Sequence, residues 1–136
     1  MIVADTSGLL ALFNRAEPAH AAVVAAVRAS SAPVVVPPFV IAEVDYLVAK
    51  RVGAHAALAV LREFASGAYT LPALDADDLR VAADVMERYG DLGIGVSDAS
   101  IVVLADRYAT RRVLTLDRRP FGVVRAADGA PFEILP

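Results

Sequence analysis

The sequence predicts an α/β fold of three layers, α/β/α, in which helices cover both faces of a central parallel sheet of about five strands. Short apolar runs alternate along the chain with longer segments whose apolar residues recur at helical spacing. The short runs are apolar almost throughout, as expected of parallel strands buried on both faces. Neither a repeat nor a linker-like segment interrupts this alternation, so we expect a single domain over residues 1–136.

The first half of the chain predicts two strands and four helices. Prolines bracket the β-branched run 33–37, as is typical of a short buried strand. Pro38 is suited to the first turn of a helix, and Gly53 and Gly67 are suited to ending one. The expected order is strand 2–4, helix 6–14, helix 18–30, strand 33–37, helix 38–53 and helix 54–67.

The second half of the chain predicts three strands and two helices. Acids crowd the first turn of the segment that begins at Asp75, where the helix dipole favours negative charge. A glycine-rich stretch then precedes Ser97, which we expect to cap the next helix. The expected order is strand 69–74, helix 75–90, helix 97–110, strand 111–116 and strand 132–135.

The composition narrows the classes of function. Hydrophobic residues make up 57% of the chain, but no apolar run reaches the roughly 18 residues of a membrane-spanning helix. The N-terminus has no basic region before its apolar run, so we expect a cytoplasmic protein that is not exported. The absence of cysteine excludes thiol catalysis and cysteine-ligated zinc. The net charge of −3 is not that of a wholly basic nucleic-acid binder, although arginines concentrate near the C-terminus.

Two aspartates follow predicted strands directly. Asp5 ends the first strand and Asp117 follows strand 111–116. Ligands of open parallel sheets bind at the carboxyl ends of the strands, so both positions are candidates for a site. The alternative for Asp5 is a helix N-cap, but Thr6 and Ser7 could serve equally well as caps. Asp117 alone is also compatible with an ordinary turn.

Two further acids lie on predicted helices. Asp98 falls on the apolar face of its helix, one turn before Ile101 and Val102, and an inward carboxylate is costly unless it is paired or bound to metal. The alternative is a carboxylate held only by the helix N-terminus. Glu43 lies at the border of the apolar stripe of helix 38–53, which is weak support when taken alone. Together the four acids can surround one pocket, where a hard divalent cation such as Mg²⁺ or Mn²⁺ would offset their repulsion.

Other catalytic classes are poorly supported. The stretch 95–99 lacks the second glycine of a nucleophile elbow, and no histidine follows His55. The glycines before it form only half of a dinucleotide fingerprint, and the single lysine, Lys50, is not in a phosphate-binding loop. A metal-free ribonuclease using His20 and His55 stays open, although nothing in the sequence places them together.

Four segments resemble the successive motifs of the PIN domain, and in particular the VapC toxins of bacterial toxin–antitoxin pairs. They are "IVADTSGLLALF", "PPFVIAEVDYLV", "YGDLGIGVSDASIVVLAD" and "VLTLDRRPF", and the resemblance extends over essentially the whole chain. It implies a PIN-like fold and an endoribonuclease dependent on Mg²⁺ or Mn²⁺ that cleaves structured RNA. Pro120 departs from the pattern, because relatives commonly carry an acid before the phenylalanine.

The resemblance also implies roles for individual residues and for partners. Asp5, Glu43, Asp98 and Asp117 would be the catalytic and metal-binding acids. Thr6, Asp91 and Thr115 would lie near the site, and Arg112, Arg118 and Arg119 would contact the RNA. The expected partners are RNA, a VapB-like antitoxin and a second copy in a homodimer. The alternatives are a non-catalytic PIN-like module that binds RNA or a partner, and a Mg²⁺-dependent phosphatase or receiver domain.

Overall fold

The computed structural model describes the whole chain, residues 1–136. It contains five strands, seven α-helices and one 3-10 helix. In chain order they are β1 (Ile2–Ala4), α1 (Thr6–Phe13), α2 (His20–Arg28), β2 (Val34–Val35), α3 (Pro38–Arg51), α4 (Ala54–Phe64), β3 (Tyr69–Thr70), α5 (Ala76–Arg88), η1 (Gly90–Leu92), α6 (Val96–Arg107), β4 (Arg112–Leu114), α7 (Arg118–Phe121) and β5 (Glu133–Leu135).

The strands form one parallel sheet in the order β3-β2-β1-β4-β5. The predicted fold class is therefore confirmed. Strand β1 lies at the centre, where Val3 is in register with Val35 on one side and with Val113 on the other. The chain moves from β1 to β2 in one direction and later returns to β4 on the opposite side of β1. The strand order thus reverses between β1 and β4, where open sheets of this kind bind their ligands.

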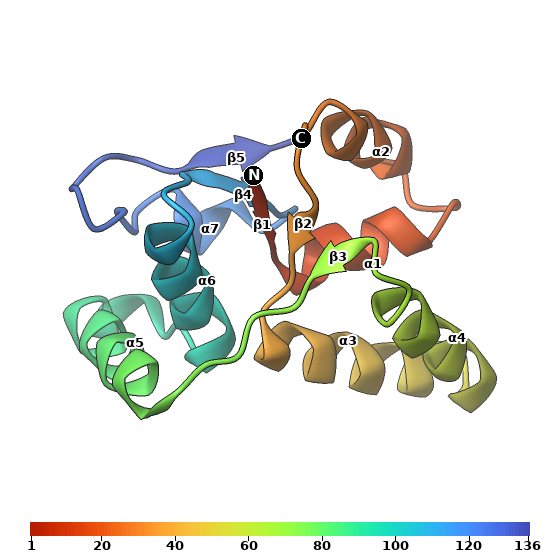
Figure 1. Cartoon of the computed structure of the whole chain (residues 1–136), viewed down its shortest axis with the longest axis horizontal. Coiled ribbons are helices and arrows are strands. Elements are labelled where there is room, and N and C mark those ends of the chain that lie inside the picture. The colour runs from red at the N-terminus through yellow and green to blue at the C-terminus, as the bar shows by residue number, and fades with distance from the viewer.

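Figure 1 shows the helices on both sides of this sheet. Helices α5, α6 and α7 lie on one side, and α1 and α2 lie on the other. Helix α3 runs along the edge at which β1 ends, and it contacts both α1 and α6. Three helices from separate parts of the chain therefore meet at the carboxyl edge of the central strands.

A single cluster of 28 buried hydrophobic residues joins the sheet to its helices. It includes β1 and β2 in full, so these strands are buried on both faces, as their continuous apolar sequence predicts. None of the helices combines the length and the apolar character that crossing a membrane requires.

The expected strand 69–74 is shortened to β3, Tyr69–Thr70, and further local differences from the expected elements concern α6 and α7. Helix α6 begins at Val96 with Gly95 at its N-cap, so the expectation that Ser97 caps it is wrong. The carbonyl of Ser97 instead accepts a hydrogen bond from the Ser100 hydroxyl. Helix α7 replaces the turn expected after Asp117, and the 3-10 helix η1 was not expected either. Both are single turns, too short to produce a periodic pattern in the sequence.

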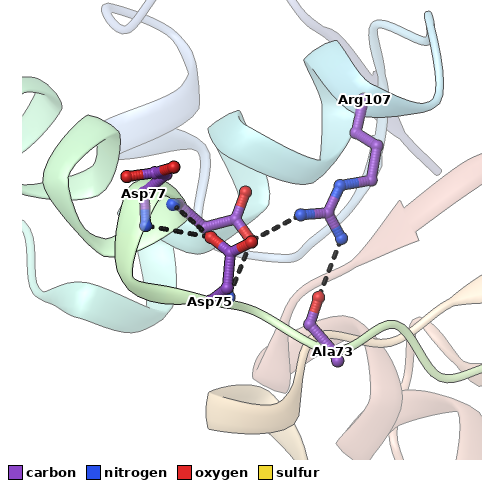
Figure 2. Close-up of polar contacts among 5 residues, drawn as sticks. Ala73, Asp75, Asp77 and Arg107 are labelled. Atoms are coloured by element: carbon purple, nitrogen blue, oxygen red, sulfur yellow. Dashed lines mark hydrogen bonds and ion pairs between the residues drawn. The ribbon is translucent and has the colours of Figure 1, made fainter.

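The acids that open α5 are helix caps. Asp75 accepts hydrogen bonds from the backbone N–H groups of Asp77 and Asp78, and the Asp78 carboxylate accepts one from the N–H of Asp75. From the end of α6, Arg107 donates to Asp78 and to the carbonyl of Ala73 (Figure 2). The Arg107 hydrogen bond is the main reason that the pKa of Asp78 is lowered. The carboxylates of Asp75 and Asp78 thus have hydrogen-bond partners within the protein, and the acids at the sheet edge can be compared with them.

Candidate metal centre at the carboxyl edge of the sheet

One cavity of about 680 Å³ opens at the carboxyl edge of the sheet. Asp5, Glu43, Asp98 and Asp117 all line it. They come from the end of β1, from α3, from the first turn of α6 and from the segment after β4. The structure thus brings together the four acids that were selected from the sequence one at a time.

Asp5 occupies the N-cap position of α1, yet its carboxylate caps no backbone N–H group. Its Oδ2 atom accepts hydrogen bonds from the hydroxyls of Ser7 and Thr115, each at 2.8 Å. Those hydroxyls in turn accept the backbone N–H groups of Leu116, at 2.9 Å, and Asp117, at 3.0 Å. Ser7 therefore does not cap the helix, although its residue type would suit that role. One oxygen of Asp5 is fixed, and Oδ1 is left for a ligand in the cavity.

Thr6 does not cap α1 either, because its hydroxyl donates to Oε2 of Glu43 at 2.8 Å. Thr6 is buried, whereas Glu43 is exposed toward the cavity. Glu43 follows the buried residue Val40 by three positions on α3, which places it on the border of the apolar stripe. The hydrogen bond ties the second turn of α3 to the start of α1 and orients the carboxylate at the cavity.

Asp98 lies in the first turn of α6 and is partly buried. Burial and the negative charge of Asp5 raise its pKa from 3.8 to about 6. The charges of Glu43 and Asp117 raise the pKa further, while the backbone of Gly95 acts in the opposite direction. Asp98 is therefore unlike Asp78, whose pKa is lowered by a cation. No cationic side chain of the protein lowers the pKa of Asp98 in this way.

Asp117 combines the two roles considered for it. Its Oδ1 accepts the backbone N–H of Arg119 at 3.1 Å, so it caps α7, and its side chain also lines the cavity. Because β4 is parallel to β1, the residues that follow the two strands reach the same edge of the sheet. This shared direction brings Asp117 and Asp5 to the same cavity.

Several residues expected near the site lie elsewhere. Arg112 opens β4 and pairs with Glu133 at 3.5 Å, so it lies toward the amino edge of the sheet, away from the cavity. Arg118 donates to the carbonyl of Pro136, and neither it nor Arg119 lines the cavity. Asp91 is exposed on η1 and is also outside the lining. Thr115 does belong to the site, through its hydrogen bond to Asp5.

Two residues of the site were not selected from the sequence. Ser7 orients Asp5, and its position two residues after a strand-end aspartate was interpreted only as a competing cap. Arg51 lines the cavity from the last turn of α3. Arg51 follows Glu43 by eight residues, with Leu47 midway, so all three lie on one face of the helix. This spacing is the sequence signal that could have indicated that Arg51 lies near the site.

The donor set suits a hard divalent cation, since it is made of carboxylate oxygens and contains neither sulfur nor imidazole. No three of the acids converge closely enough to ligate one ion directly. The spacing is compatible with Mg²⁺, which commonly keeps several waters and takes only one or two carboxylates.

The raised pKa of Asp98 predicts that the binding of a cation in this cavity depends on pH. The folded protein holds a proton on Asp98 below about pH 6, whereas the unfolded chain holds it only below about pH 3.8. As the pH falls through about 6, this proton stabilises the metal-free fold and competes with a cation for the site. We therefore expect the rise in melting temperature caused by Mn²⁺ to be large at about pH 7.5 and to shrink toward about pH 5. An equal rise at both pH values would contradict this.

A central parallel sheet with four acids at its carboxyl edge is the architecture of a PIN domain, and the model of the PIN domain family matches residues 2–127. The chain belongs to this family, among its VapC ribonucleases. It is 51% identical over 135 residues to ribonuclease VapC26 of Mycobacterium tuberculosis, and the match covers 99% of this chain and 100% of the relative. The alternatives of a phosphatase and a receiver domain are thereby removed.

Solved structures show the same fold at lower identity. VapC20 of M. tuberculosis, a toxin that cleaves the sarcin–ricin loop, has a TM-score of 0.78 at 21% identity, over 86% of this chain and 90% of that one. The DNA-bound VapBC complex of Salmonella typhimurium contains a chain with a TM-score of 0.73 at 17% identity, over 98% of this chain and 96% of that one.

Proposed function

We propose that this protein is the toxin of a toxin–antitoxin pair, an endoribonuclease that hydrolyses structured RNA with the help of Mg²⁺ or Mn²⁺. The convergence of four carboxylates on one cavity, with Asp98 raised in pKa by burial and by the others, carries the proposal. The family assignment and the identity to a named ribonuclease support it.

The residues of the cavity have separate tasks in this reaction. Asp5, Asp98, Glu43 and Asp117 would hold the cation, which lowers the pKa of a water and neutralises charge on the scissile phosphate. Ser7 and Thr115 keep one oxygen of Asp5 fixed, and Thr6 does the same for Glu43. Such prior orientation saves reorganisation during the reaction.

RNA flanking the scissile bond needs cationic contacts outside the acid cavity. Arg118 and Arg119 are exposed on α7, directly after Asp117, and we propose that they contact the RNA backbone. Arg112, which was grouped with them, is engaged with Glu133 on β5. We keep Asp91, which is exposed on η1 outside the lining of the acid cavity, as a proposed secondary acid.

The proposed antitoxin has a suitable surface beside the acids. A second cavity of about 520 Å³ lies between α1, α3 and α4. It shares Ser7, Leu10, Leu47 and Arg51 with the acid cavity. Most of its lining is hydrophobic. An amphipathic helix from a VapB-like antitoxin could occupy it and place a guanidinium among the carboxylates, where it would take the place of the metal's charge. We propose in addition that the toxin forms a homodimer.

Removal of divalent metal tests the proposed activity. The purified protein is expected to cut structured RNA with Mg²⁺ or Mn²⁺ and to stop when EDTA is added, because the cavity is lined by carboxylates and by no histidine, cysteine or lysine. Gel analysis of a labelled RNA hairpin gives the readout. Equal cleavage in EDTA would overturn the metal mechanism, and RNA binding without cleavage at any metal concentration would favour the non-catalytic module.

A further inference from the structure

Arg51 is the one cationic residue that lines the acid cavity. It belongs to the last turn of α3, and Glu43, Leu47 and Arg51 follow one another at intervals of four residues. This spacing puts them in a row on one face of the helix. At about 1.5 Å of rise per residue, the row carries Arg51 roughly 12 Å along the helix axis from Glu43. Arg51 therefore lies at the rim of the cavity rather than among the acids.

The Arg51 guanidinium has no partner within the protein. The four ion pairs of the structure involve Arg80, Arg107, Arg111 and Arg112, and no side-chain hydrogen bond includes Arg51. Arg51 is also exposed. Its situation differs from that of Arg107, whose guanidinium binds Asp78 and the carbonyl of Ala73 (Figure 2). A free guanidinium with five donors beside a catalytic cavity is available to a ligand.

The ligand best suited to a free guanidinium beside four carboxylates is a phosphate of the RNA backbone. An RNA strand has to bring its negative backbone to a cavity lined by four acids, and a cation bound among them offsets only part of their charge. A planar guanidinium binds phosphate oxygens in a bidentate manner and fixes the position of the strand. Because Arg51 forms no ion pair with any of the four acids and lies about two helical turns from Glu43, the phosphate that it would meet flanks the scissile position.

We propose that Arg51 is an RNA-positioning residue that binds a backbone phosphate flanking the scissile one and sets the register in which the strand enters the acid cavity. This rests on the proposed ribonuclease function and adds a residue to it. Since Leu10, Leu47 and Arg51 also line the apolar cavity, the strand would leave the acid site along that side of α3.

The test is steady-state cleavage of a labelled RNA hairpin by wild type and Arg51→Gln in Mn²⁺ at several salt concentrations. We expect KM to rise about tenfold while kcat stays within about twofold, and the slope of log(kcat/KM) against log[salt] should become shallower by about one, as for the loss of one phosphate contact. Arg51→Lys keeps the charge but not the bidentate geometry, so it should keep the salt slope while recovering only part of the KM.

Lys50→Gln is the matched control, because it removes the same charge one residue away. Its ammonium lies 5.7 Å from the centroid of the Tyr46 ring and does not line the cavity. Equal effects of the two variants would overturn the proposal, as would an Arg51→Gln enzyme with wild-type KM and salt slope. If Arg51 only neutralised the acids, its loss would tighten Mn²⁺ binding and leave the salt slope unchanged. A wild-type protein that cuts no RNA would instead overturn the proposed function, and this inference with it.

Discussion

We expect the replacement of Asp98 by asparagine to abolish RNA cleavage and to leave the fold intact. We expect kcat/KM to fall by at least about 1000-fold, or about 4 kcal/mol of transition-state stabilisation, because a bound metal contributes several kcal/mol to phosphodiester hydrolysis. The metal-free variant should be as stable as wild type or more stable by about 1 kcal/mol, because it loses one of four like charges. Mn²⁺ should raise the melting temperature of wild type and have little effect on the variant.

Asp106→Asn is the control for this result. Asp106 lies two turns later on α6, is exposed, and does not line the acid cavity. Its replacement should leave cleavage, stability and the response to Mn²⁺ close to those of wild type. If Asp98 served only the helix dipole, Asp98→Asn would lower stability and Mn²⁺ would not distinguish it from wild type. Melting curves that show a less stable variant with the same response to Mn²⁺ as wild type would contradict the interpretation of Asp98 as a metal ligand.

Replacing Gly8 by alanine should cause the largest loss of stability. Gly8 is buried in α1, where an added Cβ would lie 2.4 Å from the carbonyl oxygen of Leu114. Helix and strand backbones would have to separate, and we expect a loss of about 3 kcal/mol in spite of the roughly 1 kcal/mol by which alanine is the better helix former. The melting temperature should fall by about 10 °C. The same shift would displace Asp5 from Thr115, so cleavage should fall as well.

Gly90→Ala separates this steric effect from the general effect of adding a methyl group. No atom lies within 4 Å of the Cβ position at Gly90, and its backbone is not in the left-handed region. We expect its free energy of unfolding to stay within about 0.5 kcal/mol of wild type. Urea titrations followed by circular dichroism compare the two variants with wild type. A Gly8→Ala variant with the stability of wild type would show that α1 and β4 can move apart freely.

Much of this fold could be predicted from the sequence because its central strands are short and buried on both faces. Continuous apolar runs such as 2–4, separated by helical segments, are typical of a parallel sheet, and β1 and β2 are strands of this kind. The edge strands β3 and β5 are only partly buried. The strand-end position of Asp5 could likewise be inferred before its neighbours were known. These inferences succeed because a buried strand and a charge at its end are local features of the sequence.

Two kinds of feature could not be predicted in this way: those that depend on the direction of a strand in the sheet, and those that depend on which of two neighbouring residues caps a helix. Ser97 is a better cap by residue type than Gly95, but the helix begins earlier than a cap at Ser97 allows. Arg112 was grouped with Arg118 because the two are close in sequence, yet the direction of β4 separates them. Arg51 was not selected from the sequence, because only the direction of α3 across the sheet edge brings its last turn to the cavity.

The pairing of β1 with β4 has a consequence for how the protein becomes active. The strand that places Asp5 is completed on one side only by Val113 and Leu114, which follow it about 110 residues later in the chain. Contacts between residues so distant in sequence close late and slowly during folding. A chain halted before residue 112 would already contain Asp5, Glu43 and Asp98, but it would lack Thr115 to orient the first of them and Asp117 to complete the set. The acid cavity is therefore complete only after residues 112–117 have joined the sheet beside β1.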